Sequence, residues 1–158
     1  MFEITATTVN AYLTFNGTCE EAFNLYKSVF GGEFPYVGRF KDMPSHGGEK
    51  PTPEGWGDKI MHISLPISKE TTLMGSDTSQ EWAPDVTVGN NITLSVNTQN
   101  ETDAKRIFNA LAESGKIKMP LEKTFWQSYF GMLTDKFGIN WMVNCELESH
   151  KDFEEENR

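Results

Sequence analysis

The stretch AYLTFNGTCEEA (residues 11–22) sets the pattern from which the fold can be predicted. Its first six residues alternate apolar and polar side chains, which is typical of a strand that is buried on one face. Thr18 and Glu21 then have the spacing of a capping box, which marks the start of a helix. Gly31 and Gly32 predict where this helix ends, because glycine accepts the left-handed conformation found there. Its apolar face comprises Ala22, Leu25, Tyr26 and Val29.

The same pattern recurs 81 residues further on, where Leu94–Asn97 align with Leu13–Asn16. NITLSVN (residues 91–97) alternates again and predicts a second strand. Thr98 with Glu101 and Asn100 with Asp103 are overlapping capping boxes, and the sequence leaves open which of them forms. The next apolar helix face comprises Ala104, Ile107, Phe108 and Leu111, and Gly115 is expected to close the helix.

Three strand-like runs follow each helix, so that each half has the order β-α-β-β-β. They are residues 34–41, 59–67 and 71–77 in the first half, and 116–121, 128–135 and 141–147 in the second. One helix covers one face of such a sheet, so the other face must be buried elsewhere. We therefore expect an α+β fold: a single domain (1–158) of two βαβββ modules, at about 8–77 and 90–147, followed by an acidic tail at 148–158.

Charge and composition exclude several classes of partner. The net charge is −9, of which residues 146–158 contribute −4 through six acids and two bases. Nucleic-acid binding needs clustered Lys and Arg, so we expect none. No run approaches the roughly 18 apolar residues that span a bilayer, and the N-terminus lacks a basic signal-peptide region. We expect a cytoplasmic protein without a membrane partner, and its two cysteines, Cys19 and Cys145, fit a reducing compartment.

Motifs in both halves resemble PhnB-like proteins of the glyoxalase/bleomycin-resistance (vicinal oxygen chelate) superfamily. In the first half the resemblance rests on residues 16–22 (NGTCEEA), Tyr26 and residues 30–32 (FGG). It is stronger in the second half and spans about residues 8–147 in all. The second-half motifs are FNALA (108–112), GK (115–116), TFW (124–126), FG (130–131), TDKFG (134–138) and WMVN (141–144).

The resemblance implies a curled mixed sheet around a cavity that holds a small organic molecule, often with a divalent metal. It also implies a homodimer, although whether the modules pair within one chain or between two stays open. Family members often carry a ubiquinone-methyltransferase label. Nothing in the sequence supports that activity, because no strand is followed by a glycine-rich turn that opens a helix, as a nucleotide-type methyl donor would require.

Metal-dependent members of the superfamily place His and Glu ligands on the first and last strands of each module. None of the corresponding side chains here is an imidazole or a carboxylate. We therefore expect no metal cofactor in the usual positions. The positions carried over are Asn10 or Ala11, Leu73 and Met74, Asn91 or Thr93, and Met142.

His62 is the most interesting of three histidines, since His46 lies in a Pro/Gly-rich loop and His150 in the tail. Strand alternation predicts that Ile60, His62 and Ser64 share one face. His62 would then contact a ligand or carry a proton in the cavity, or simply be a hydrogen-bonded residue of a half-buried strand.

Four further residues are candidates for the cavity: Tyr12, Asp77, Trp126 and Phe130. For Tyr12 a place in the core or at an interface is equally compatible with the sequence, and Asp77 could instead set a turn. Trp126 could line the ligand site or fill the core, whereas we expect Phe125 in the core and Asp135 in a turn. Cys19 starts a helix, but no His or Lys motif accompanies it, so a nucleophile is not expected.

Three functions are compatible with these features. The first is a protein that binds a small organic molecule, with or without a metal-independent enzymatic activity, and the substrate is left open. The second is a metal-free sequestration module of the bleomycin-resistance type. A metal-dependent lyase or dioxygenase is disfavoured by the missing ligands. A hydrogen bond between His62 and Asp77 would favour catalysis, and a wall of Trp and Phe without such a pair would favour sequestration.

Overall fold

The computed structural model describes residues 6–43, 52–79 and 86–147, and the predictions for His46, His150 and the acidic tail concern residues outside these ranges. The chain divides into two compact modules, Met1–Thr87 and Val88–Arg158. The first contains β1 (Tyr12–Phe15), α1 (Cys19–Phe30), β2 (Tyr36–Arg39), the 3₁₀ turn η1 (Phe40–Asp42), β3 (Ile60–Pro66) and β4 (Thr72–Asp77). The second contains β5 (Leu94–Thr98), α2 (Glu101–Ala112), β6 (Lys116–Lys123), β7 (Ser128–Thr134) and β8 (Asn140–Glu146).

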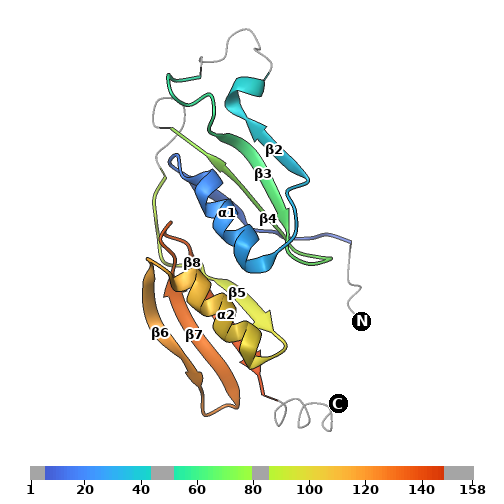
Figure 1. The fold of residues 1–158 in the computed structure, drawn as a ribbon, viewed down its shortest axis with the longest axis vertical. Helices are drawn as coiled ribbons and strands as arrows, with labels where there is room; N and C mark the ends of the chain where they lie inside the picture. The colour runs from blue at the N-terminus through green and yellow to red at the C-terminus, as the bar shows by residue number, and fades with distance from the viewer. Residues whose placement is uncertain (1–5, 44–51, 80–85, 148–158) are drawn as a thin grey trace. The chain divides into compact units, whose positions relative to one another are not determined.

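Both modules have the predicted βαβββ topology (Figure 1). The strand order is β1-β4-β3-β2 in one sheet and β5-β8-β7-β6 in the other. In each sheet the first strand runs parallel to the last and the remaining pairs are antiparallel, so both sheets are mixed. This confirms the expected α+β class. Within the described residues, no helix is long and apolar enough to cross a membrane.

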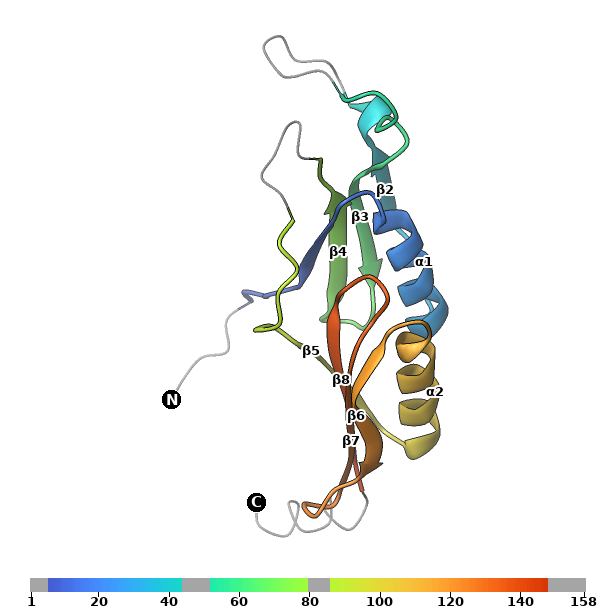
Figure 2. The same cartoon turned by 90° about the vertical axis from the view of Figure 1, so that its left-hand side faces the viewer.

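Each helix lies on one face of its own sheet (Figure 2). The contact is apolar on both sides. In α2 it buries the face predicted from the 3.6-residue period, whereas in α1 Phe23 is buried in place of the predicted Leu25, which is half-buried. Between α1 and its sheet the buried residues are Phe15, Ala22, Phe23, Tyr26, Val29, Ile60, Ile63, Leu65 and Leu73. The corresponding residues of the second module are Ala104, Ile107, Phe108, Leu111, Leu133, Trp141, Val143 and Cys145.

The two helices start differently, and one prediction was wrong. Thr18 precedes α1 but makes no side-chain cap, because its backbone (φ −111°, ψ 12°) is not in the extended conformation that capping residues adopt. Of the two overlapping capping boxes predicted for α2, the one of Asn100 forms: its Oδ1 accepts from the Asp103 N–H at 2.8 Å. Where Thr18 fails, the Asp77 carboxylate takes its place: Oδ1 accepts from the Cys19 N–H at 2.9 Å.

The helix ends also differ from one another. Gly31 has φ 79° and donates its N–H to the Lys27 carbonyl, as predicted for the end of α1. In the second module the left-handed residue is Ser114 (φ 58°) rather than Gly115. Gly115 is needed for another reason, because a Cβ at this position would overlap the Thr134 carbonyl. The glycine allows a close backbone approach instead of a left-handed turn.

A β-bulge in β3 corrects the predicted faces of that strand. Gly38 pairs with His62 while Arg39 pairs with Ile60, so Met61 is an extra residue between them. The bulge returns Ile60 to the helix side, where it is fully buried with Ile63 and Leu65. His62 and Ser64 remain together on the opposite side, but Ile60 does not join them.

Each helix lays a phenylalanine ring on a strand glycine. A Cβ at Gly75 would lie 2.6 Å from Phe23 Cε2, and one at Gly131 would lie 2.7 Å from Phe108 Cε2. Backbone atoms close the other side, since the same Cβ positions approach Leu13 O at 2.8 Å and Leu121 Cα at 2.9 Å. These glycines therefore set how closely helix and sheet approach.

We expect Gly75→Ala and Gly131→Ala each to lower the free energy of unfolding by about 1–3 kcal/mol, because the new methyl group overpacks a filled core. Urea denaturation followed by far-UV circular dichroism measures the change. Gly89→Ala is the matched control, because its nearest neighbour would be Asn91 Oδ1 at 3.7 Å. If Gly75→Ala cost no more than this control, the helix–sheet spacing would not depend on the glycine.

Candidate functional site

The face of the first sheet opposite α1, which we call the open face of the first module, carries the candidate site. Its residues alternate along each strand with those that α1 buries. Cross-strand pairing brings them into rows, one of which joins Tyr12, Met74, Ser64 and Tyr36. The open face comprises Tyr12, Thr14, Tyr36, Gly38, His62, Ser64, Pro66, Thr72, Met74 and Ser76, and the Met61 side chain reaches it over Gly38.

Three rings gather on this face and form what we call the ring cluster: Tyr12, His62 and Tyr36. The Tyr12 hydroxyl lies 3.2 Å from His62 Nδ1, within hydrogen-bond distance, and the tautomer of His62 decides which of them donates. The His62 ring centroid is 5.6 Å from that of Tyr12 and 5.8 Å from that of Tyr36. His62 is half-buried, whereas Tyr12 and Tyr36 are 48% and 51% exposed. The cluster therefore presents aromatic surface and hydroxyl groups to the outside.

Gly38 makes room for the Tyr36 ring. A Cβ at residue 38 would lie 2.7 Å from Tyr36 Oη and 2.9 Å from both Tyr36 Cε1 and Met61 Cε. The Tyr36 ring thus lies low over the glycine instead of standing away from the sheet, which brings it toward His62. Because Gly38 pairs with His62 across the strands, the missing side chain and the imidazole are neighbours.

Strand β2 is fixed to the start of α1 by a two-point ion pair. Arg39 Nη1 and Nη2 donate to the two carboxylate oxygens of Glu20, each at 2.8 Å, and Nη1 also donates to the Asp58 carbonyl. The hydrogen bond from Arg39 holds the pKa of Glu20 below its usual value. The pair therefore persists above the ordinary Glu pKa and is lost only as the pH falls through the lowered one. It anchors the strand that carries Tyr36 and Gly38.

Asp77 lies on the helix side, away from the ring cluster. It is 3% exposed, and its two oxygens accept from the backbone N–H groups of Cys19 and Ile60, both at 2.9 Å. The carboxylate thus joins the end of β4 to the starts of α1 and β3. The His62–Asp77 pair that would have favoured catalysis is not formed.

Cys19 is buried beneath the start of α1. Burial raises the pKa of its thiol well above the ordinary value, and the negative charges of Asp77 and Glu20 raise it further. The thiolate is the nucleophilic form of cysteine, so this group is unsuited to covalent catalysis. The expectation that Cys19 is not a nucleophile agrees with this environment.

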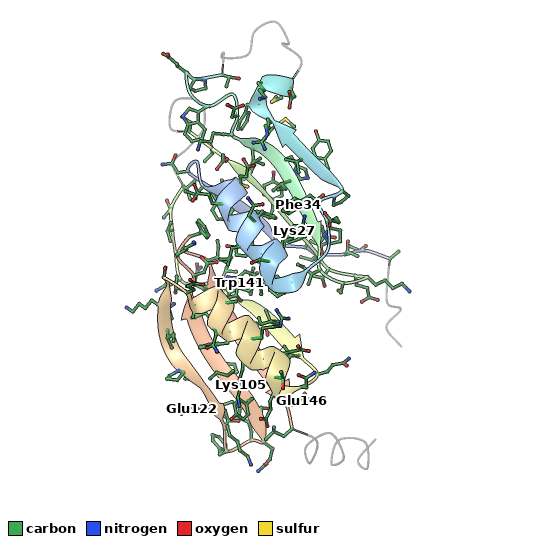
Figure 3. The ribbon with its side chains drawn as sticks, viewed as in Figure 1. Lys27, Phe34, Lys105, Glu122, Trp141 and Glu146 are labelled. Atoms are coloured by element: carbon green, nitrogen blue, oxygen red, sulfur yellow. The ribbon has the colours of Figure 1, made fainter. Side chains whose placement is uncertain are left out.

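The face of the second sheet opposite α2, which we call the open face of the second module, carries Phe130, and Trp126 packs against it. Lys105 of α2, labelled in Figure 3, lies 5.3 Å from the Tyr129 ring centroid. This contact places Tyr129 on the helix side, and strand alternation places Phe130 on the other. The ring centroids of Trp126 and Phe130 are 6.1 Å apart, and Trp126 is 45% exposed. These two candidates therefore lie together, in a different module from Tyr12 and His62.

Phe125 is not a core residue, contrary to expectation. It is 90% exposed and packs edge-on against Trp126 at 4.9 Å between ring centroids. Both lie in the turn between β6 and β7, where Gln127 has φ 63° and the Thr124 N–H donates to the Ser128 carbonyl. The tight turn carries their side chains beyond the sheet, so the core has no place for Phe125.

Asp135 sets a turn, as predicted. Its Oδ1 accepts from the N–H groups of Phe137 and Ile139, and its Oδ2 accepts from Trp141 Nε1 at 2.9 Å. The carboxylate is 3% exposed and holds the β7–β8 connection against the buried indole.

The two open faces carry different chemistry at equivalent positions. The two modules can be aligned through one helix-side row of cross-strand partners in each. The row of the first module is Leu13, Gly75, Ile63 and Val37, and that of the second is Leu94, Trp141, Leu133 and Ile117. By this alignment His62 corresponds to Met132 and Tyr36 to Lys116, while the offset of 81 residues aligns Tyr12 with Thr93. The ring cluster therefore has no copy in the second module.

The residues present do not fit the metal site that the resemblance implies. Over residues 6–43, 52–79 and 86–147, no three His, Cys, Asp or Glu side chains are grouped so that they could hold a metal ion. The carried-over positions offer only amide, hydroxyl, thioether and hydrocarbon groups, which do not match an imidazole and carboxylate site.

Two residues of the site were missed from the sequence. Tyr36 lay in a predicted strand, but nothing in its local pattern linked it to His62. Gly38 could have been noticed, since a glycine inside a strand often marks a bulge or a close approach. Both the bulge and the approach occur here.

Comparison with known proteins gives consistent results. A family model described as 3-demethylubiquinone-9 3-methyltransferase matches residues 7–144. Protein YjdN of Escherichia coli (strain K12) is 33% identical over 141 residues, which cover 86% of this chain and 93% of that protein.

Solved structures also resemble this chain. Protein PA1353 from Pseudomonas aeruginosa is 41% identical with a TM-score of 0.75, covering 89% of this chain and 98% of that one. A putative 3-demethylubiquinone-9 3-methyltransferase, PhnB protein, from Bacillus cereus is 26% identical with a TM-score of 0.70, covering 88% and 99%. The fosfomycin resistance protein FosX from Listeria monocytogenes, complexed with Mn(II) and sulfate, is 9% identical with a TM-score of 0.57 and shares the fold alone, over 94% and 98%.

We expect Asp77→Asn to lower the free energy of unfolding by about 1–3 kcal/mol, because an amide can accept at one oxygen only and leaves one backbone N–H facing its own NH₂ group. Thermal and urea denaturation measure the loss. Asp58→Asn is the matched control, since its side chain is 81% exposed and should change stability little. If the two variants were equally stable, the Asp77 carboxylate would not be needed for the fold, and a functional role for it would have to be considered again.

Proposed function

The chain belongs to the PhnB-like family whose model is described as 3-demethylubiquinone-9 3-methyltransferase, and from this premise we propose that it binds a small organic molecule on the open face of its first module. The observation that carries the proposal is the ring cluster. Two half-exposed tyrosines flank a half-buried imidazole on a sheet face that the module's own helix does not cover. Exposed aromatic groups beside a few polar atoms are typical of small-molecule sites.

Binding without a metal is part of this proposal. It is supported by the donor groups at the positions that metal-dependent relatives use, none of which is an imidazole or a carboxylate. The rings in contact with His62 are those of Tyr12 and Tyr36. A tyrosine and a histidine can exchange a proton with a ligand, but among the residues that the structure describes no carboxylate orients the imidazole as in general-base pairs. This favours binding or sequestration over catalysis.

Methyl transfer, the activity in the family description, is not part of the proposal. The strand-to-helix connections are Asn16–Thr18 and the short Gln99–Asn100 turn, and neither is the glycine-rich turn of a nucleotide-type donor site. A cytoplasmic setting is part of the proposal, and the two buried free cysteines support it.

The binding proposal is tested by ligand-observed NMR of the whole protein against a library of small fragments, with EDTA present throughout. We expect to find fragments whose binding signal is about tenfold weaker with His62→Ala or Tyr12→Ala than with the unmodified protein. The reason is that these variants remove aromatic contact area and a hydrogen-bonding group. Phe125→Ala is the control, since it removes an exposed ring from the second module. Fragments that bind all three variants equally, or that need a divalent metal, would contradict the proposal.

We also propose that the chain forms a homodimer. Each module leaves one sheet face without a helix, and apolar side chains of such faces are usually buried against a further layer. Met119 on β6, which pairs with Met132, is 46% exposed and adds apolar surface to such a face. Sedimentation velocity should give twice the chain mass of 17.9 kDa. A species that stays monomeric at every concentration studied would overturn this expectation.

A further inference from the structure

The open face of the first module carries no formal charge. Its residues are tyrosines, threonines, serines, two methionines, a proline, a glycine and His62, with no Asp, Glu, Lys or Arg among them. The chain as a whole has a net charge of −9. An anionic ligand would therefore meet no cationic partner on this face and would be repelled by the rest of the protein.

The open face of the second module provides a contrast within the same fold. Glu122 on β6 and Glu146 on β8 pair across the sheet with the open-face residues Phe130 and Ser128. Both acids are labelled in Figure 3. Lys116 stands where the first module has Tyr36. The lack of charge around the ring cluster is thus a property of this face and not of the fold.

The ring cluster is shaped for a flat group. Gly38 lets the Tyr36 ring lie low on the sheet, and the His62 ring is tilted by 31° to Tyr12 and by 46° to Tyr36. About half of each tyrosine is accessible to a ligand. Aromatic rings prefer offset or edge contacts with other rings, so a planar aromatic molecule can cover this surface better than a bulky aliphatic one.

Hydrogen-bonding capacity remains at the cluster. The contact with Tyr12 uses His62 Nδ1, which leaves Nε2. Within the described ranges, no hydrogen-bond partner is recorded for the Tyr36 hydroxyl or for His62 Nε2. A ligand with one uncharged donor or acceptor group beside its ring could satisfy either of them.

We propose that the ring cluster of Tyr12, His62 and Tyr36 binds an uncharged, planar aromatic molecule that carries a hydrogen-bonding group. This inference rests on the proposed function and specifies the class of ligand for the same site. Gly38 is its positioning residue, since it sets the height of Tyr36 without touching the ligand through a side chain of its own.

The test uses four probes of similar size: benzamide, benzoate, benzamidinium and cyclohexanecarboxamide. Benzoate and benzamidinium keep the ring and the planar shape of benzamide but replace its neutral amide by an anionic acceptor or a cationic donor group, and cyclohexanecarboxamide keeps the amide but lacks the aromatic ring. Each is titrated into the whole protein while the ring signals of ¹³C-labelled His62 are followed by NMR. We expect benzamide to shift these signals with a Kd about tenfold lower than the other three.

Two variants test the geometry. Tyr36→Leu and Gly38→Ala should each weaken benzamide binding by about tenfold, the second because its methyl group displaces the Tyr36 ring. Phe125→Leu and Gly89→Ala are the matched controls and should bind as the unmodified protein does. If Gly38→Ala fails to fold, Tyr36→Leu alone decides.

The outcomes separate the two proposals. If benzoate, benzamidinium or cyclohexanecarboxamide shifts the His62 signals as tightly as benzamide, the ligand class is wrong but the site stands. If no probe moves His62 and the fragment library also finds nothing at the cluster, the proposed function itself fails. A benzamide effect that survives Tyr36→Leu unchanged would remove the ring cluster as its binding site.

Discussion

The first module depends on a single buried carboxylate, that of Asp77. Its two oxygens accept from the N–H groups that begin α1 and β3, and so join three elements that are 58 and 17 residues apart in sequence. Helix starts leave backbone N–H groups without partners, and a buried one costs free energy unless an acceptor reaches it. By supplying that acceptor from β4, Asp77 fixes the helix on one side of the sheet. The ring cluster lies on the side that the helix leaves uncovered.

The two faces of the first sheet differ in role: one packs against the helix and the other carries the candidate site. The helix side is apolar and closely packed, down to glycines that accept phenylalanine rings. The open side carries hydroxyl groups, an imidazole and half-exposed rings. Strand alternation produces this division, because neighbouring residues point to opposite faces. A substitution on one face therefore changes either the packing or the chemistry of the surface, and seldom both.

The sequence predicted the elements well because their signals are local. Alternation in residues 11–16, the apolar face of α1 and Gly31 all concern residues within a few positions of one another. Two of the failures involve distant partners: Asp77 caps α1 in place of Thr18, and the pairing of Gly38 with His62 includes a bulge that moves Ile60 to the helix side. Phe125 was misplaced for a local reason, since the tight turn at Gln127 carries it away from the core. Of the site residues, Tyr12 and His62 were predicted and lie together, as do Trp126 and Phe130. Whether they bind a ligand stays a prediction.

The duplicated architecture has an evolutionary consequence. Since Asp77 and the strand glycines secure the fold from the helix side, a substitution on an open face leaves these contacts in place. The two halves of this chain already differ on their open faces, since His62 in one corresponds to Met132 in the other. A lineage can thus acquire a new binding surface in one copy while the other copy keeps the old one.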